Sequence, residues 1–163
     1  MKRIVIDAGI WNHWYNVEEN DEDSFQVINN YLSSESNEIL CLDENNVIAD
    51  EYKRNTCGDF YRVIRNCYDR IDYLPSDISE DICSGLKDTG FHEESDMCYV
   101  GVALHADKII ISIDGDYGVS PAEHYRSEKE LESKRKVAAY MMEILGLNVY
   151  TPHQYINPEA VVE

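Results

Sequence analysis

The feature that most constrains the fold is a short apolar run late in the chain. Residues 108–113 read K-I-I-I-S-I, so four of these six residues are isoleucine. A strand this uniformly apolar is typical of the interior of a parallel sheet, where helices cover both faces. The run ends at Asp114, where the chain passes at once from an apolar strand to an acidic side chain. The run therefore predicts a parallel strand followed by a polar loop.

Strand and helix signals alternate along the rest of the chain. Further strands are predicted at residues 2–6, 38–42 and 147–150, while between residues 43 and 107 only helices and turns are predicted. Apolar spacing and capping residues predict helices at 24–32, 47–55, 60–68, 78–86, 93–105 and 127–145, with a short helix after Pro152. The last long helix is expected to bury Leu131, Ala138, Met141, Met142 and Leu145. This alternation predicts a single α/β domain over residues 1–163 with a mainly parallel sheet.

Composition and targeting signals point to a cytoplasmic globular protein without a membrane segment. The 163 residues are enough for one domain, and 44% of them are apolar. No apolar run approaches the ~20 residues of a membrane helix. The N-terminal apolar stretch is interrupted at Asp7, which is too early for a signal peptide. The five cysteines are odd in number and contain no C-x-x-C pair, so we expect reduced thiols.

Acidic residues follow two of the predicted strands directly. Asp7 ends the strand at 2–6, and Asp114 ends the strand at 108–113. Asp116 comes two residues later, across a glycine. A single acid in such a place is most simply a helix cap or a solvated turn. Because the carboxyl ends of parallel strands open on the same edge of a sheet, the two groups together predict a site there.

Two acids on predicted helices extend this group. Glu51 shares a helix face with Ile48, which is an unusual position for a solvated glutamate. Asp96 lies in the first turn of its helix, where the simpler interpretation is interaction with the helix dipole. Converging carboxylates repel one another unless a cation neutralises them, and hard oxygen ligands select Mg²⁺ or Mn²⁺. Such an ion can polarise a phosphoryl oxygen and activate a water for in-line attack.

The segments that carry these acids resemble the PIN-domain nucleases in their order along the chain. They read R-I-V-I-D, A-D-E-Y, E-S-D-M-C-Y-V-G-V-A and I-I-I-S-I-D-G-D-Y, and they span about residues 1–150. In that family an aspartate ends the first strand, a glutamate lies on a mid-chain helix, and an aspartate precedes an alanine by seven residues. One or two further acids follow a hydrophobic strand. The matching residues here are Asp7, Glu51, Asp96 with Ala103, and Asp114 with Asp116.

The resemblance implies a three-layer α/β/α sandwich and metal-dependent cleavage of phosphodiester bonds, most often in RNA. It implies that Asp7, Asp96 and Asp114 hold Mg²⁺ or Mn²⁺. Glu51 and Asp116 would complete the ligand shell or orient the water. Family members also carry a small polar residue shortly after the first aspartate, and Asn12 is the candidate for that role, although the spacing varies.

The same resemblance leaves two functional classes open. One is an endoribonuclease that acts as a toxin in a toxin–antitoxin pair, in phage defence or in RNA processing. The other is a PIN-fold module that binds nucleic acid or protein without turnover. The alternatives of single-stranded DNA as the substrate and of a homo-oligomer also stay open.

The net charge works against nucleic-acid binding. There are 32 acidic and 14 basic residues, which gives −18, and such a surface repels phosphates. Ten basic residues fall into two groups: Lys53, Arg54, Arg62, Arg65 and Arg70 after Glu51, and Arg126, Lys129, Lys134, Arg135 and Lys136 after Asp116. These are either ordinary solvated helix faces or phosphate contacts, for which Lys134 and Arg135 are the first candidates. A basic partner or antitoxin protein that supplies most of the binding is the further possibility.

Two other signals receive less weight. The segment I-I-I-S-I-D-G-D-Y-G also resembles the first motif of haloacid dehalogenase-like phosphatases, but that motif normally lies near the N-terminus, and only 47 residues follow Asp116 here. Trp11 and Trp14 follow Asp7 closely and could stack on a base. Packing in the core is the favoured interpretation of the two tryptophans.

Overall fold

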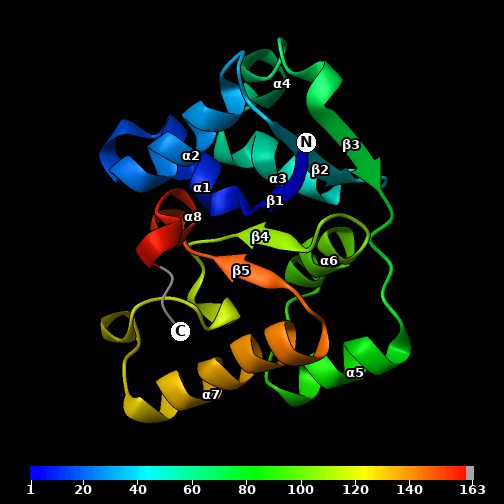
Figure 1. Cartoon of the computed structure of the whole chain (residues 1–163), viewed down its shortest axis with the longest axis vertical. Coiled ribbons are helices and arrows are strands. Elements are labelled where there is room, and N and C mark those ends of the chain that lie inside the picture. The colour runs from blue at the N-terminus through cyan, green and yellow to red at the C-terminus, as the bar shows by residue number, and fades with distance from the viewer. Residues whose placement is uncertain (161–163) are drawn as a thin grey trace.

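Five parallel strands form one sheet at the centre of the structure, a computed structural model that describes residues 1–160 (Figure 1). The strands are β1 (Lys2–Ile6), β2 (Glu38–Asp43), β3 (Ile71–Leu74), β4 (Ile109–Ile111) and β5 (Asn148–Tyr150). Their order is β3-β2-β1-β4-β5, and every neighbouring pair is parallel. Strands β2 and β3 lie on one side of β1, and strands β4 and β5 lie on the other side, so the direction in which strands are added reverses between β1 and β4. In open parallel sheets, ligands bind at this point.

Helices cover both faces, and the expected three-layer α/β/α sandwich is confirmed. The helices are α1 (Ala8–Tyr15), α2 (Glu22–Leu32), α3 (Val47–Asn55), α4 (Phe60–Val63), α5 (Glu80–Asp88), α6 (Glu94–Leu104), α7 (Glu128–Ala139) and α8 (Pro152–Ile156). Helix α2 packs against β2 and α8, whereas α6 packs against β1, β2 and β4. Capping side chains start several helices as the sequence predicts: Asp21 accepts from the Ser24 amide and Ser127 from the Glu130 amide. Among the helices of residues 1–160, none combines the length and apolar character needed to cross a membrane.

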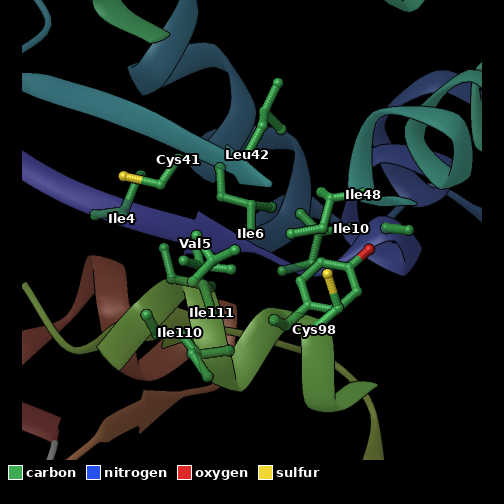
Figure 2. Packing of buried hydrophobic residues seen from close by; sticks show 14 of the residues in the cluster. Ile4, Val5, Ile6, Ile10, Cys41, Leu42, Ile48, Cys98, Ile110 and Ile111 are labelled. Carbon is green, nitrogen blue, oxygen red and sulfur yellow. The ribbon is translucent and has the colours of Figure 1, made fainter. Parts of the chain in front are cut away.

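The central strands form the core (Figure 2). Ile4, Val5 and Ile6 of β1 are fully buried and lie between side chains of β2 and β4. The apolar run that predicted an interior strand is β4, and Ile110 and Ile111 are fully buried there. Trp11 is also completely buried, with its ring 5.3 Å from those of Tyr52 and Phe60, so core packing is the correct interpretation for Trp11.

The region between residues 56 and 74 differs from the prediction. The helix predicted at 60–68 ends at Val63, and a 3₁₀ turn follows at Tyr68–Arg70. The next four residues form β3, which was not predicted. They read I-D-Y-L, a pattern too short to identify a strand by itself, and pairing with β2 along residues 40–43 decides their conformation. Helix α1 was likewise not assigned, because its glycine and aromatic residues have low helix propensity and its packing stabilises it.

The helix predicted at 127–145 changes character near its end. Regular α-helix stops at Ala139, and residues Tyr140–Ile144 form a π-helical turn. A π-turn holds more residues per turn, so the following side chains rotate relative to an α-helical pattern. Met141 and Leu145 remain buried, but Met142 is 62% exposed, so its assignment to the core is wrong. Leu131 is half-buried and does not belong to the core either.

Candidate metal centre

The first acid, Asp7, lies at the junction of β1 and α1 and is held from the neighbouring strand. Its backbone amide donates to the Ile111 carbonyl at 2.9 Å, which continues the pairing of β1 with β4. The Ser112 hydroxyl donates to the Asp7 carboxylate at 2.6 Å and accepts from the Asp114 amide at 2.9 Å. Ser112 therefore joins the two strand-end aspartates. The role of Ser112 was not predicted. The sequence did contain a signal for it, because Ser112 is the single hydroxyl residue in an otherwise apolar strand and lies two residues before Asp114.

The loop after β4 brings Asp114 and Asp116 together. The Asp114 carboxylate accepts from the Asp116 amide at 2.9 Å and starts the 3₁₀ turn Gly115–Tyr117. The turn ends at Gly118, whose φ is +78°. A Cβ at Gly118 would lie 1.9 Å from the Lys134 carbonyl oxygen, so only glycine permits both this backbone and the close approach of α7. The acidic loop is thus packed directly on α7.

Helices α3 and α6 supply the remaining two acids. The helices pack against each other, and the Tyr99 hydroxyl of α6 donates to the Glu51 carboxylate of α3 at 3.0 Å. Asp96 lies in the first turn of α6. Carboxylate oxygens of Asp96, Asp114 and Asp116 all lie within 4.8 Å of one another. Asp96 therefore meets two acids that lie 18 and 20 residues later in the chain. We use the name acidic centre for these three acids together with Asp7 and Glu51.

The pKa values of three of the five carboxylates are raised. Burial, and after it the charges of Asp114, Asp7, Asp116 and Glu51, together raise the pKa of Asp96 to about 7. The pKa of Asp7 is raised to about 6, mainly by burial and to a smaller extent by the charges of Asp114 and Glu51, against the lowering effect of the Ser112 hydrogen bond. The pKa of Asp114 is raised as well, mainly by burial. The fold therefore holds these carboxylates where their charged forms are costly.

One basic side chain reaches the acidic centre. The Lys134 ammonium lies 2.8 Å from the Asp116 carboxylate, and in residues 1–160 it forms the sole ion pair made by the five acids. Arg135 faces the loop backbone, where its guanidinium donates to the Gly118 carbonyl at 2.6 Å and lies 5.6 Å from the centre of the Tyr125 ring. Of the two basic residues selected from the sequence, Lys134 contacts the acids and Arg135 holds the loop against α7.

Two other predicted contacts are placed elsewhere. The Asn12 amide donates to Glu19 at 2.6 Å, and within the described residues its side chain has no hydrogen bond to the five acids. Arg70 was grouped with the surface basic residues, but it is only 6% exposed and donates to the carbonyls of Tyr31 and Ser33. Arg70 is therefore a structural residue, and the prediction that it belongs to a phosphate-binding group is wrong.

The residues of the acidic centre fit a divalent cation. Oxygens that share one Mg²⁺ lie at most roughly 4 Å apart, close to the separation found here. Tyr117 is fully buried, and within residues 1–160 its hydroxyl has no hydrogen-bond partner. Burial and the charges of Asp7, Asp96 and Asp114 raise the pKa of Tyr117, so this hydroxyl is a neutral donor beside the acids. A hydrated divalent cation would offset the charge of these carboxylates.

Comparison with known proteins adds no relative. No family model matches this chain, and neither a curated protein nor a solved structure matches it. The likeness to PIN domains therefore stays a prediction that depends on the ordered acids.

Proposed function

We propose that this protein is a metal-dependent nuclease that cleaves phosphodiester bonds, with RNA as its substrate. The observation that carries the proposal is that Asp96 of α6 meets Asp114 and Asp116 at the carboxyl edge of a parallel sheet, where Ser112 joins Asp7 to Asp114. Asp7 comes from the end of β1, Glu51 from α3, Asp96 from α6, and Asp114 and Asp116 from the loop after β4. Raised carboxylate pKa values in one cluster are typical of functional sites.

The acids divide into two roles under this proposal. Asp96, Asp114 and Asp116 would hold Mg²⁺ or Mn²⁺, with Asp7 beside them and fixed by Ser112. A bound divalent cation polarises a phosphoryl oxygen and lowers the pKa of a water. Glu51, oriented by the Tyr99 hydroxyl, is assigned to accept the proton of the attacking water. The water oxygen would form the new bond to phosphorus as the P–O ester bond breaks, and the leaving oxygen would take a proton from solvent water.

Lys134 is assigned to the phosphate. Its ammonium offsets one carboxylate of the acidic centre and, with three donor protons, has capacity left for a phosphate oxygen. Arg135 supports this position indirectly, since its bond to the Gly118 carbonyl keeps α7 on the acidic loop. Cytoplasmic RNA substrates and a role as a toxin, in phage defence or in RNA processing belong to the same proposal.

The net charge of −18 makes weak binding to nucleic acid the expectation for the isolated chain. We therefore include a basic partner, such as an antitoxin protein, as a component that would raise affinity in the complete system.

Metal-supported cleavage tests the proposal. We expect the purified chain to cleave single-stranded RNA with Mn²⁺ or Mg²⁺ and to stop when the metal is chelated. Calorimetric titration of the metal should show binding that Asp114→Asn weakens. The assignment is wrong if Asp7→Asn and Asp114→Asn both cleave as fast as the unsubstituted protein.

One observation favours a non-catalytic binding module as the second candidate. Lys134 already neutralises Asp116, which reduces the need for a cation. If the protein binds RNA but neither takes up Mn²⁺ nor cleaves any strand, this second candidate replaces the first.

A further inference from the structure

Three tyrosines gather on the surface formed by α4, the turn at 68–70 and β3, at the end of the molecule opposite α5 and α7 (Figure 1). Tyr68 is 58% exposed and Tyr73 is 50% exposed, while Tyr61 is half-buried. The Tyr68 hydroxyl donates to the Tyr61 carbonyl at 3.2 Å. Tyr61 and Tyr68 both lie close enough to Tyr73 to raise its pKa, in addition to the larger effect of partial burial. We call these three residues the tyrosine patch.

Several basic residues lie on the segment that carries Tyr61, and one of them, Lys53, contacts the tyrosine patch. The Lys53 ammonium lies 5.8 Å from the centre of the Tyr61 ring. Residues 53–65 contain four basic residues and one acidic residue, in a chain whose net charge is −18. Lys53 and Arg62 pair with neighbouring aspartates. Arg54 and Arg65 are exposed, and neither has an ion pair in the described part of the chain. Asp69 and Asp72 adjoin Tyr68 and Tyr73, so the charges near the tyrosine patch are balanced, in contrast to those of the chain as a whole.

The tyrosine patch and the acidic centre lie on two sides of one helix. Helix α3 contacts α6, which carries Asp96, and also contacts α4, which carries Tyr61. Glu51 of α3 faces α6, where it meets Tyr99, whereas Lys53 of the same helix faces the Tyr61 ring. A helix with its side chains is roughly 10–12 Å across, which an extended strand of two or three nucleotides can span.

The chemistry of this surface matches one class of ligand. Flat exposed rings with neighbouring cations are the combination that binds single-stranded nucleic acid, because bases stack on the rings while the cations contact phosphates. A docking surface for an apolar protein would need aliphatic side chains here, yet the exposed groups are phenols, guanidinium ions and the Asp69 carboxylate. Stacking gains affinity without requiring a positively charged protein.

We propose that the tyrosine patch is a second contact for single-stranded RNA, on which unpaired bases next to the cleavage site stack. This proposal rests on the proposed function for the identity of the ligand. It adds a binding surface that lies outside the acidic centre and sets a preference for unpaired strands.

Binding without cleavage tests the proposal. Fluorescence anisotropy of labelled U₁₂ RNA is measured at low salt in EDTA with four proteins: the unsubstituted chain, Tyr68→Ala/Tyr73→Ala, Tyr68→Phe/Tyr73→Phe and Phe25→Ala. Phe25 is 42% exposed on α2, so the last variant removes an exposed ring elsewhere. Circular dichroism confirms that each variant folds.

We expect the double alanine variant to bind at least tenfold more weakly, while the phenylalanine and Phe25→Ala variants stay within about twofold, because stacking needs only the ring. Affinity should also fall with added salt. The proposal is overturned if the alanine variant binds like the unsubstituted protein, if the phenylalanine variant loses as much affinity as the alanine variant, or if U₁₂ does not bind.

The two proposals fail separately. A protein that binds U₁₂ through the tyrosines but never cleaves RNA retains the patch and refutes the nuclease. A protein that cleaves RNA equally well after both tyrosines become alanine refutes the patch alone.

Discussion

The acidic centre and the tyrosine patch differ in the burial and charge of their side chains, although α3 contributes to both. In the acidic centre the charges are partly buried and repel one another, so the fold tolerates an unfavourable arrangement there. In the tyrosine patch the rings of Tyr68 and Tyr73 are exposed, and a lysine lies against the ring of Tyr61. The difference teaches that a net charge of −18 describes the surface only on average. Negative charge is concentrated where a cation would bind, and a surface with balanced charges lies one helix away.

Removal of one acid should give the largest difference between the effect on cleavage and the effect on RNA binding. We expect Asp114→Asn to lower the cleavage rate by roughly 10³-fold, because the shared group of carboxylates loses a charged ligand. Single-turnover cleavage with Mn²⁺ measures this effect. Anisotropy with U₁₂ in EDTA should change by less than about threefold, and an equal loss in both assays would mean that the two regions are one site.

The tyrosine variant should give the reverse pattern. We expect Tyr68→Ala/Tyr73→Ala to raise the KM for single-stranded RNA by about ten- to a hundredfold, since each stacked base contributes roughly 1–3 kcal/mol. Its affinity for Mn²⁺, measured by calorimetry, should stay unchanged because neither tyrosine contacts the five acids. A weakened metal affinity would show that α3 couples the two regions.

Lys134 offers a test of charge within the acidic centre. We expect Lys134→Met to bind Mn²⁺ about tenfold more tightly, because a competing cation 2.8 Å from Asp116 is removed. RNA cleavage should nevertheless slow, since the proposed phosphate contact is lost. Lys87→Met on α5, an exposed lysine, is the matched control and should leave metal affinity unchanged. Weaker metal binding by Lys134→Met would contradict the assigned role.

The smallest effect concerns stability and pH in the metal-free protein. The pKa of Asp96 in the fold, about 7, lies above its ordinary value of 3.8, so the folded state binds more protons than the unfolded state between these values. Stability from this group is therefore present at low pH and is lost as pH rises through 7. Asp7, with a pKa of about 6, contributes in the same direction.

Thermal unfolding in EDTA measures this effect. We expect Asp96→Asn to raise Tm at pH 8 by about 2–8 °C, which corresponds to about 1–2 kcal/mol after screening by solvent. The gain should shrink at pH 5, where Asp96 is protonated in the fold. An equal gain at both pH values would indicate a packing effect instead of charge repulsion.

Local sequence patterns were sufficient for the parts of the fold that repeat a simple rule. The runs at 2–6 and 108–113 identified β1 and β4, because uniformly apolar strands belong in the interior of a parallel sheet. Asp7 and Asp114 could be placed at one edge of that sheet for the same reason, since the direction of parallel strands fixes where their ends lie. The helix caps at Asp21 and Ser127 were also readable locally.

Contacts between distant segments decided the remainder. Strand β3 exists because β2 supplies its hydrogen bonds, and the π-turn that exposes Met142 has no signature in the apolar spacing. Ser112 and Asp7 are 105 residues apart, and Lys134 reaches Asp116 only because Gly118 lets α7 approach. Amino-acid order therefore determined the central strands, most of the helices and the acids that follow β1 and β4. Tertiary packing decided which side chains meet, because a meeting depends on how whole elements cross and not on the residues adjacent in the chain.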